Sequence, residues 1–238
     1  MNDDRLLIRP ARSHDAQALA PLEITATTGI TEYVYGGIIP GLTTAEIVTH
    51  RFADATHPLS YRSCSVAECD GQVVGFVQAH AYDEEIPPPD LPIPEQRFDV
   101  FEPADDMPAP GTYHVNAMAV AEQQRGAGIG RRLLESVFSD AARIGHEVVS
   151  LYVFDQNLPA KRLYEKCGFR IVDRRPSLWR EPILFTGDLL SMRADLSRVQ
   201  VSRVCTIIDR NRIGNFTRRS GPCGASASND NESPRRRR

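Results

Sequence analysis

Residues 125–130 read Arg-Gly-Ala-Gly-Ile-Gly and carry the strongest chemical signal in the chain. An apolar run from Val115 to Val120 precedes them, and a helical pattern from Arg131 to Ile144 follows. A strand that turns through glycines into a helix points several free backbone N–H groups at one place, where the helix dipole adds partial positive charge. Such a turn suits a phosphate or pyrophosphate, so the sequence predicts a cofactor that carries one.

The residues that flank the turn argue against two common phosphate sites. A nucleoside-triphosphate loop needs Lys followed by Ser or Thr after the last glycine, whereas Arg131 and Arg132 stand there. A dinucleotide-binding fold places its glycine turn after the first strand of a βαβ unit. Here the turn follows hairpin strands in the middle of the chain, although Asp155 stands 25 residues further on. For an isolated glycine motif, a tight turn without a ligand is the alternative.

A second motif follows the first. Asn157-Leu-Pro-Ala-Lys-Arg-Leu-Tyr-Glu-Lys-Cys-Gly-Phe169 begins 27 residues after Gly130. Together with Arg125-x-x-Gly128-x-Gly130 it resembles the acetyl-CoA signature of GNAT-type N-acetyltransferases in order, spacing and expected structure. The resemblance covers about residues 5–196. It implies a mixed α/β fold with a central, mostly antiparallel seven-stranded sheet, flanked by about four helices.

The resemblance implies acetyl-CoA as co-substrate and indicates which residues would hold it. The backbone N–H groups of the turn would bind the CoA pyrophosphate. The preceding strand end would offer backbone groups to the pantetheine arm and the acetyl carbonyl, where this strand separates from the strand at 148–154. Asn157 would lie near the pantetheine and is also a good helix N-cap. The expected binding residues are Met118, Ala119, Val120, Arg125, Gly126, Ala127, Gly128, Ile129, Gly130 and Asn157, with no metal.

Acetyl transfer to an amine needs a base, an oxyanion donor and an acid. In the family, the tyrosine at the position of Tyr164 protonates the departing CoA thiolate, and core packing is the alternative for this side chain. An ammonium with a pKa of ~10 must first lose its proton. Glu32, His114 and Asn116 are candidates for the base, of which Asn116 could only orient a water molecule. A backbone N–H near Val120 could stabilise the oxyanion.

The elements that must position these residues alternate in type along the chain. Strands are predicted at 6–9, 63–68, 73–80, 113–120, 148–154, 169–173 and 188–196, and helices at 13–24, 43–52, 131–144 and 157–167. Asp70-Gly71 predicts a hairpin turn between the second and third strands. The stretch from Thr25 to Leu42 is rich in glycine and is predicted to form turns.

Residues 81–110 differ in composition from the rest of the chain. They hold eight prolines and nine acidic residues against one Arg, which predicts a loop and not a core element. Substrate choice in the superfamily lies in the first helices, their loop and the segment before the central strand, here residues 25–42 and 81–110. Their tyrosines and carboxylates could attract a cationic amine, although a solvated acidic loop is the simpler interpretation.

Charge and cysteine content limit the class of protein. The net charge is −3, and nine Arg oppose three acidic residues from Val201 onward, so residues 1–200 carry −9. This balance disfavours nucleic acid as a partner. Five cysteines without metal-ligand spacing, no signal peptide and no membrane-length apolar run predict a cytoplasmic protein. We expect a domain at 1–196 and a basic, disordered tail at 197–238.

The leading hypothesis is therefore an acetyl-CoA-dependent N-acetyltransferase that acts on the primary amine of a small molecule or peptide by direct attack. A non-catalytic acyl-CoA-binding sensor or scaffold would use the same turn, but the presence of Tyr164 counts against it. A nucleotide-binding switch is disfavoured because Lys-Ser/Thr is missing from the turn. The identity of the amine and the oligomeric state, with a homodimer among the options, are left open.

Overall fold

A seven-stranded sheet with the strand order β1-β2-β3-β4-β5-β7-β6 lies at the centre of the protein. The structure is a computed structural model that describes residues 6–84, 86, 87 and 90–199. Only β4 and β5 are parallel neighbours; all other neighbouring strands are antiparallel. The strands are β1 (Leu6–Pro10), β2 (Cys64–Cys69), β3 (Gln72–Ala81), β4 (Tyr113–Val120), β5 (Val148–Phe154), β6 (Arg170–Pro176) and β7 (Asp188–Asp195). The predicted mixed, mostly antiparallel sheet is confirmed.

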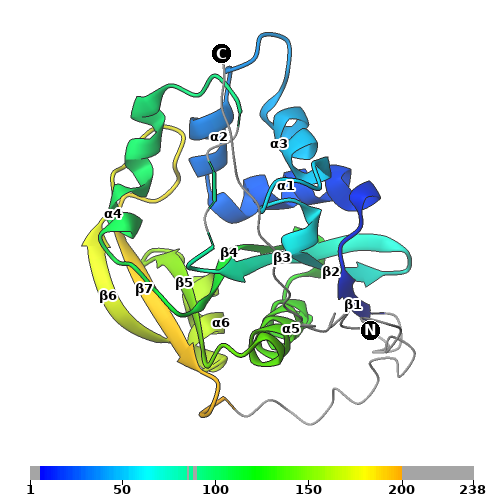
Figure 1. The fold of residues 1–238 in the computed structure, drawn as a ribbon, viewed down its shortest axis with the longest axis vertical. Coiled ribbons are helices and arrows are strands. Elements are labelled where there is room, and N and C mark those ends of the chain that lie inside the picture. Colours follow the sequence, from blue (N-terminus) through cyan, green and yellow to red (C-terminus); the bar gives the residue numbers. More distant parts are fainter. Residues whose placement is uncertain (1–5, 85, 88–89, 200–238) are drawn as a thin grey trace, which may run out of the picture. The chain divides into compact units, whose positions relative to one another are not determined.

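Helices cover both faces of this sheet. α1 (Ala16–Thr27) and α3 (Thr44–Ala53) pack on one face, and α5 (Ile129–Ile144) and α6 (Leu158–Lys166) pack on the other (Figure 1). These four helices correspond to the four that the sequence predicts. Short 3-10 turns lie at Ser13–Asp15, Tyr61–Ser63 and Glu122–Gln124.

Two segments predicted as turns or loops contain short helices. α2 (Ile30–Tyr35) lies within the glycine-rich stretch, and α4 (Glu102–Asp105) follows the 3-10 segment η4 (Glu95–Phe101) in the acidic, proline-rich segment. Both segments contribute to a buried apolar cluster, through Val34 from α2 and Val100 from η4. The prediction that residues 81–110 contain no core element is therefore wrong. Proline and carboxylates dominate the composition and mask the few apolar residues that are buried.

The predicted apolar face of α5 builds the larger core. Ile129, Leu133, Val137 and Ala141 recur every fourth residue, and none is more than 3% exposed. They pack with buried residues of the sheet and with Tyr164 of α6. On the opposite face, Phe52 of α3 meets Phe76 of β3 edge to face, with 6.2 Å between ring centroids. The residues whose periodicity predicts α5 are thus the residues that the structure buries.

The incomplete pairing of β4 with β5 is the feature that positions the site. The two strands pair only at Tyr113–Val149, His114–Ser150 and Val115–Leu151, although both continue further. Asn116 is an extra residue in β4, because Ala117 pairs with Gln78 of β3 while Val115 pairs with Ala79. Such a bulge bends the strand that carries it. The expected separation of β4 from β5 therefore begins at the bulge.

Part of the chain's C-terminal region cannot be compared with the sequence predictions. From residue 200 onward the predicted tail lies outside the described residues, as do Cys205 and Cys223. Cys64, Cys69 and Cys167 are free thiols. Across residues 6–199, leaving aside the undescribed 85, 88 and 89, no helix is both long enough and apolar enough to cross a bilayer.

The substitution Leu133→Ala is expected to lower the free energy of unfolding by roughly 2–5 kcal/mol. The Leu133 side chain is fully buried between α5 and the sheet, so its loss leaves a cavity. Leu158→Ala is the matched control, because Leu158 is 50% exposed on α6. Urea unfolding of both variants measures the difference, and equal losses would contradict the core role of this face of α5.

Candidate functional site

The turn between β4 and α5 forms as predicted. Gly126 and Gly128 both have φ +80°, a left-handed conformation that favours glycine, and Gly128 is the N-cap of α5. A Cβ atom at either position would meet no protein atom within 4 Å. Glycine is therefore required here by backbone conformation and not by tight packing, and space lies directly against the backbone of the turn.

The backbone N–H groups of this turn are largely free of protein acceptors. The α-helical bonding begins with Arg132 N–H, which donates to Gly128 O at 3.2 Å. Within the part of the chain that the structure describes, no carbonyl accepts from the N–H groups of residues 126–130. Because Ala127, Gly128, Ile129 and Gly130 precede or begin a 16-residue helix, their amides lie at its positive end.

The backbone N–H of Arg125 is not free, although the sequence predicts it among the groups that bind phosphate. Its N–H donates to Glu122 O at 3.2 Å, within the preceding 3-10 turn, so this amide is already satisfied. Its side-chain Nε donates to Val120 O at 3.1 Å. The amide of Arg125 is therefore not available to a phosphate. The side chain instead ties the start of the turn to the end of β4.

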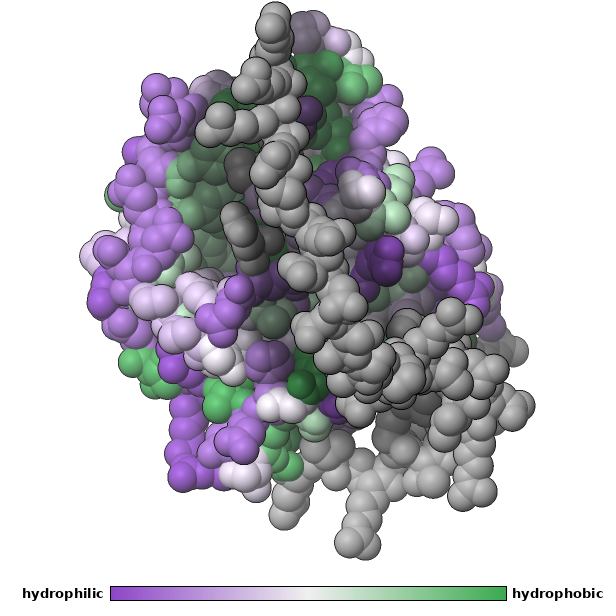
Figure 2. Space-filling model, in the orientation of Figure 1, coloured by the Kyte–Doolittle hydropathy of each residue, from purple (hydrophilic) through white to green (hydrophobic). Residues whose placement is uncertain are grey.

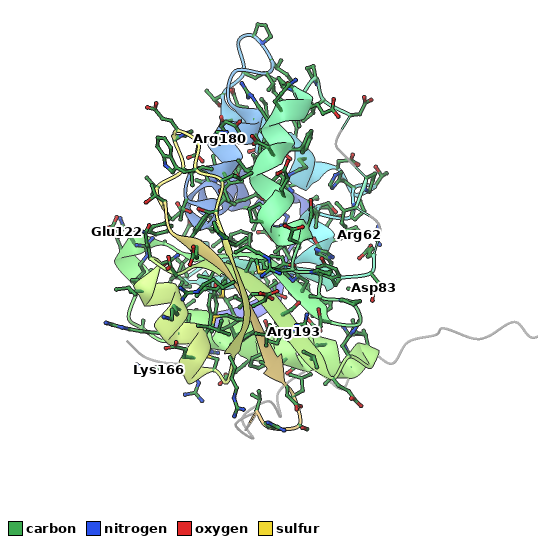
Figure 3. All side chains as sticks on the ribbon, turned by 90° about the vertical axis from the view of Figure 1, so that its left-hand side faces the viewer. Arg62, Asp83, Glu122, Lys166, Arg180 and Arg193 are labelled. Carbon is green, nitrogen blue, oxygen red and sulfur yellow. The ribbon has the colours of Figure 1, made fainter. Side chains whose placement is uncertain are left out.

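The two predicted sequence motifs lie side by side. A Cβ atom on Gly130 would lie 2.9 Å from Leu163 Cδ2, so the absence of a side chain there allows α6 to approach α5. Asn157 is the N-cap of α6, and its Oδ1 accepts the Ala160 N–H at 3.3 Å. In Figure 3, Glu122 of the turn and Lys166 of α6 lie at the same edge of the molecule.

The end of β4 offers an unpaired backbone edge. Met118, Ala119 and Val120 pair with β3 on one side and lie beyond the last pair with β5 on the other. Met118 and Val120 pack against the core on the α5 side, and Ala119 packs against the core on the α1 side. The backbone edge that faces β5 can therefore bind a ligand that lies between the two strands.

Tyr164 is placed by α6 in the larger core. It is 7% exposed, its ring lies 5.7 Å from that of Phe169, and its hydroxyl has no hydrogen-bond partner among residues 6–199 as far as they are described. Burial raises its pKa to about 12. The core packing considered as an alternative is thus present. The hydroxyl is also protonated at neutral pH, and a protonated hydroxyl without a partner can donate to a ligand.

His114 is buried beside other aromatic rings and is a weak base. Its Nδ1 lies 2.9 Å from Ser150 Oγ, which is 2.6 Å from Thr112 Oγ1. Burial and the neighbouring His80 lower the pKa of His114 to about 3. At neutral pH it is therefore uncharged and accepts protons poorly. Ser150 is 1% exposed, so this Ser–His contact is closed to a substrate.

The other two candidate bases lie on different elements. Asn116 is exposed at the bulge, and its Nδ2 donates to Oε1 of the fully buried Gln78 at 2.8 Å. Glu32 lies on α2, and its Oε2 is buried with no hydrogen-bond partner in the described structure. Hydrogen bonds do not join Tyr164, Glu32, His114 and Asn116 to one another in the part of the chain described, so the four do not form one network.

The loop between β6 and β7, residues 177–187, also belongs to this region, and no pattern in the sequence points to it. Phe185 of this loop packs on Phe154 at the end of β5, with 5.5 Å between ring centroids. The loop also contacts α2 through Ile183. Among the residues described, no three His, Cys, Asp or Glu side chains are grouped so as to hold a metal ion.

The substitution His114→Gln should reduce the loss of stability on acidification. The pKa of His114 is about 3 in the folded protein and 6.5 in an unperturbed histidine, so between these values the unfolded chain binds more protons. Stability therefore falls as the pH is lowered through this window, by up to about 1.4 kcal/mol per pH unit from this group.

Urea unfolding of the wild type and the variant between about pH 7 and pH 5 measures this effect. His50→Gln, at an exposed histidine of α3, is the matched control for the loss of an imidazole. Parallel curves for wild type and His114→Gln would contradict the burial of a neutral His114.

Known proteins are similar to this chain in sequence and in fold. The acetyltransferase (GNAT) family profile matches residues 40–169, more than half of the chain. An N-alpha-acetyltransferase from Sulfurisphaera tokodaii is 34% identical over 108 residues, 45% of this chain and 56% of that protein. A mycothiol acetyltransferase from Corynebacterium aurimucosum is 39% identical over 70 residues, 29% of this chain and 22% of that protein. The matched segments thus span between 22% and 56% of these curated relatives.

A solved structure supports the same relationship. The crystal structure of an acetyltransferase matches with a TM-score of 0.54 at 25% identity, covering 80% of this chain and 99% of that chain. This match extends over most of the fold, well beyond the residues that the family profile covers. The chain belongs to the acetyltransferase (GNAT) family.

Proposed function

We propose that residues 1–196 form an acetyl-CoA-dependent N-acetyltransferase that moves the acetyl group to a primary amine. One observation carries this proposal: the N–H groups of residues 126–130 have no acceptor within the described structure and lie at the start of α5. The adjoining end of β4 is unpaired on the side that faces β5. Free amides at a helix N-terminus bind phosphate groups, and membership of the GNAT family supports CoA as the molecule that carries them.

The chain would hold acetyl-CoA mainly by backbone groups. The amides of residues 126–130 would bind the pyrophosphate, with open space at Gly126 and Gly128 for its oxygens. The pantetheine arm would follow the free edge of β4 at Met118–Val120, and Asn157 would lie beside it at the start of α6. A backbone N–H near Val120 would then stabilise the oxyanion that forms at the thioester carbonyl.

The proposed reaction is a direct attack. The amine nitrogen forms a bond with the acetyl carbonyl carbon, the C–S bond of the thioester breaks, and the thiolate receives the Tyr164 proton. The raised pKa of Tyr164 keeps this proton in place at neutral pH until the thiolate develops. Of the three candidate bases, Asn116 does not titrate and His114 has a pKa of about 3. We therefore assign the proton of the amine to Glu32, whose Oε2 has no partner among the described residues.

The substitution Gly128→Ala should weaken CoA binding by about tenfold or more, which corresponds to ~1.4 kcal/mol. The added Cβ disfavours φ +80° and enters the open space where the phosphate is expected. Gly71→Ala is the matched control, since Gly71 has φ +79° and no neighbour within 4 Å of its Cβ position, but lies in the β2–β3 hairpin. Calorimetric titration with CoA compares the two, and similar affinities would contradict the proposed site.

The substitution Tyr164→Phe should lower the rate of thiol release from acetyl-CoA by about 10²-fold, because the proton donor is lost. CoA affinity should stay unchanged, and Tyr61→Phe, in the 3-10 turn before β2, should behave as wild type. Thiol release across a panel of amines measures the rate. A wild-type protein that binds CoA but releases no thiol with any amine would instead be an acyl-CoA sensor or scaffold.

A further inference from the structure

Gln78 of β3 is a fully buried polar residue beside the bulge of β4, and no pattern in the sequence points to it. Its side chain lies on the side of the sheet that carries α1, because Nε2 is 3.6 Å from Sγ of Cys64, which belongs to the core cluster under that helix. A buried carboxamide costs free energy unless its donors and its acceptor are bonded. The partners of Gln78 therefore decide which way its amide group is turned.

Two acceptors fix the nitrogen of the Gln78 side chain. Nε2 donates to the backbone oxygen of Leu59 at 2.9 Å and to Oγ of Ser63 at 3.1 Å. Leu59 O can only accept, and Ser63 Oγ uses its own proton toward Ser60 O at 2.9 Å, so the atom opposite both must be a donor. Both hydrogens of Nε2 are used in this way, which leaves Oε1 as the atom that faces β4.

The orientation of Gln78 determines the orientation of Asn116. Asn116 Nδ2 donates to Gln78 Oε1 at 2.8 Å. An amide group carries its nitrogen on one side and its oxygen on the other, so Oδ1 of Asn116 faces away from Gln78. Among the residues that the structure describes, none donates a hydrogen bond to this oxygen. The chain therefore presents a fixed acceptor at this place.

Asn116 stands where the free edge of β4 begins. Val115 is the last residue of β4 that pairs with β5, and Asn116 is the extra residue of the bulge. Although β4 is the central strand of the seven, Asn116 is exposed, which requires an opening there. In the proposed complex the pantetheine arm runs from the glycine turn along Met118–Val120 and so extends toward Asn116. An amine that attacks the thioester would therefore approach this oxygen.

The surroundings of Asn116 favour a hydrogen bond from a ligand. Phe76, Ala117 and Ala119, on the same side of β3 and β4 as Gln78, are buried and apolar. In Figure 2, hydrophobic residues gather in the upper half of the face, in the region between α2 and α4 of Figure 1, which lies on this side of the sheet. Water competes less for an acceptor beside apolar groups, so a hydrogen bond to Oδ1 is strengthened.

A primary amine can use this acceptor while it attacks. When the nitrogen lone pair bonds to the acetyl carbonyl carbon, the nitrogen becomes positively charged and still carries two hydrogens. One proton leaves to the base, which we propose to be Glu32, and the other N–H can donate to Asn116 Oδ1. A charged donor forms a stronger hydrogen bond than a neutral amine, so the contact stabilises the transition state more than the bound substrate.

We infer that Asn116 accepts an N–H of the attacking amine, and that Gln78 is the positioning residue that keeps the Asn116 oxygen turned toward it. This inference rests on the proposed function. Asn116 takes no proton in this role, in keeping with a side chain that does not titrate. A secondary amine carries a single hydrogen at the same stage, and the base must remove it. The pair of side chains therefore favours primary amines.

The first test removes the acceptor. Asn116→Ala should lower kcat/KM for a primary amine by about tenfold or more, because a hydrogen bond to a charged nitrogen is lost, while the KM for acetyl-CoA stays the same. The amine is whichever of alanine amide, linear diamines and peptide N-termini the wild type uses best. Gln72→Ala is the matched control, since it removes an exposed carboxamide at the start of β3. A wild-type kcat/KM in Asn116→Ala would overturn the inference.

The second test separates positioning by Gln78 from packing. Gln78→Glu and Gln78→Met keep the length of the side chain, but only Glu keeps an oxygen that accepts from Asn116 Nδ2. Burial raises the pKa of such a Glu, so its neutral carboxyl group can still donate to Leu59 O. A packing role alone predicts that the apolar Met is tolerated better.

We expect the reverse order for these two variants. Gln78→Met should lose about tenfold in kcat/KM and should discriminate less than the wild type between a primary amine and its N-methyl derivative, whereas Gln78→Glu should stay closer to the wild type in both. If Gln78→Met is as active as Gln78→Glu, or if it keeps the wild-type preference for the primary amine, the positioning role is contradicted.

The third test examines the orientation without turnover. In a nuclear magnetic resonance experiment, the side-chain N–H signals of Asn116 are identified by their loss in Asn116→Ala. They should exchange with solvent about tenfold more slowly in the wild type than in Gln78→Met. Exchange in the wild type as fast as that of the exposed Gln72 carboxamide would overturn the inference. A wild type that does not bind CoA in a calorimetric titration would instead contradict the proposed function.

Discussion

The loss of hydrogen bonding between β4 and β5 after three residue pairs is the constraint on which this molecule depends. In an uninterrupted sheet, the edge of β4 from Asn116 to Val120 would be occupied by its neighbour. The bulge at Asn116 bends β4 at the point where pairing ends, and the strand then leads into the glycine turn. The free edge of β4 therefore leads directly to the free amides at the start of α5. An elongated cofactor that carries phosphate groups requires such a continuous row of backbone groups.

The remaining elements pack on the two faces of the sheet around this opening. On the face covered by α5 and α6, the approach of Leu163 to Gly130 holds the two helices together and places Tyr164 in the core. On the other face, one buried apolar cluster joins α2, residues 94–107 and the β6–β7 loop. The contacts on the two faces are separate, so they can be altered independently.

Local patterns in the sequence were sufficient for some parts of this arrangement. The four-residue spacing of Ile129, Leu133, Val137 and Ala141 predicts α5, and the glycines of residues 125–130 predict the turn. The contact between Thr28 and Leu184 could not be predicted, because it joins residues far apart in the chain. The weak basicity of His114 depends likewise on burial by β5. Sequence composition misled at two places: glycines in residues 25–42 concealed α2, and acidic residues and prolines in residues 81–110 outnumbered a few buried apolar side chains.

The most direct measurement is the change in backbone amide chemical shifts when CoA is added to the isotopically labelled protein. The account predicts the largest changes at the amides of residues 126–130, smaller changes along Met118–Val120, and little change at Arg125, whose N–H is bonded to Glu122 O. Largest changes at amides away from the β4–α5 turn, or none at saturating CoA, would contradict it.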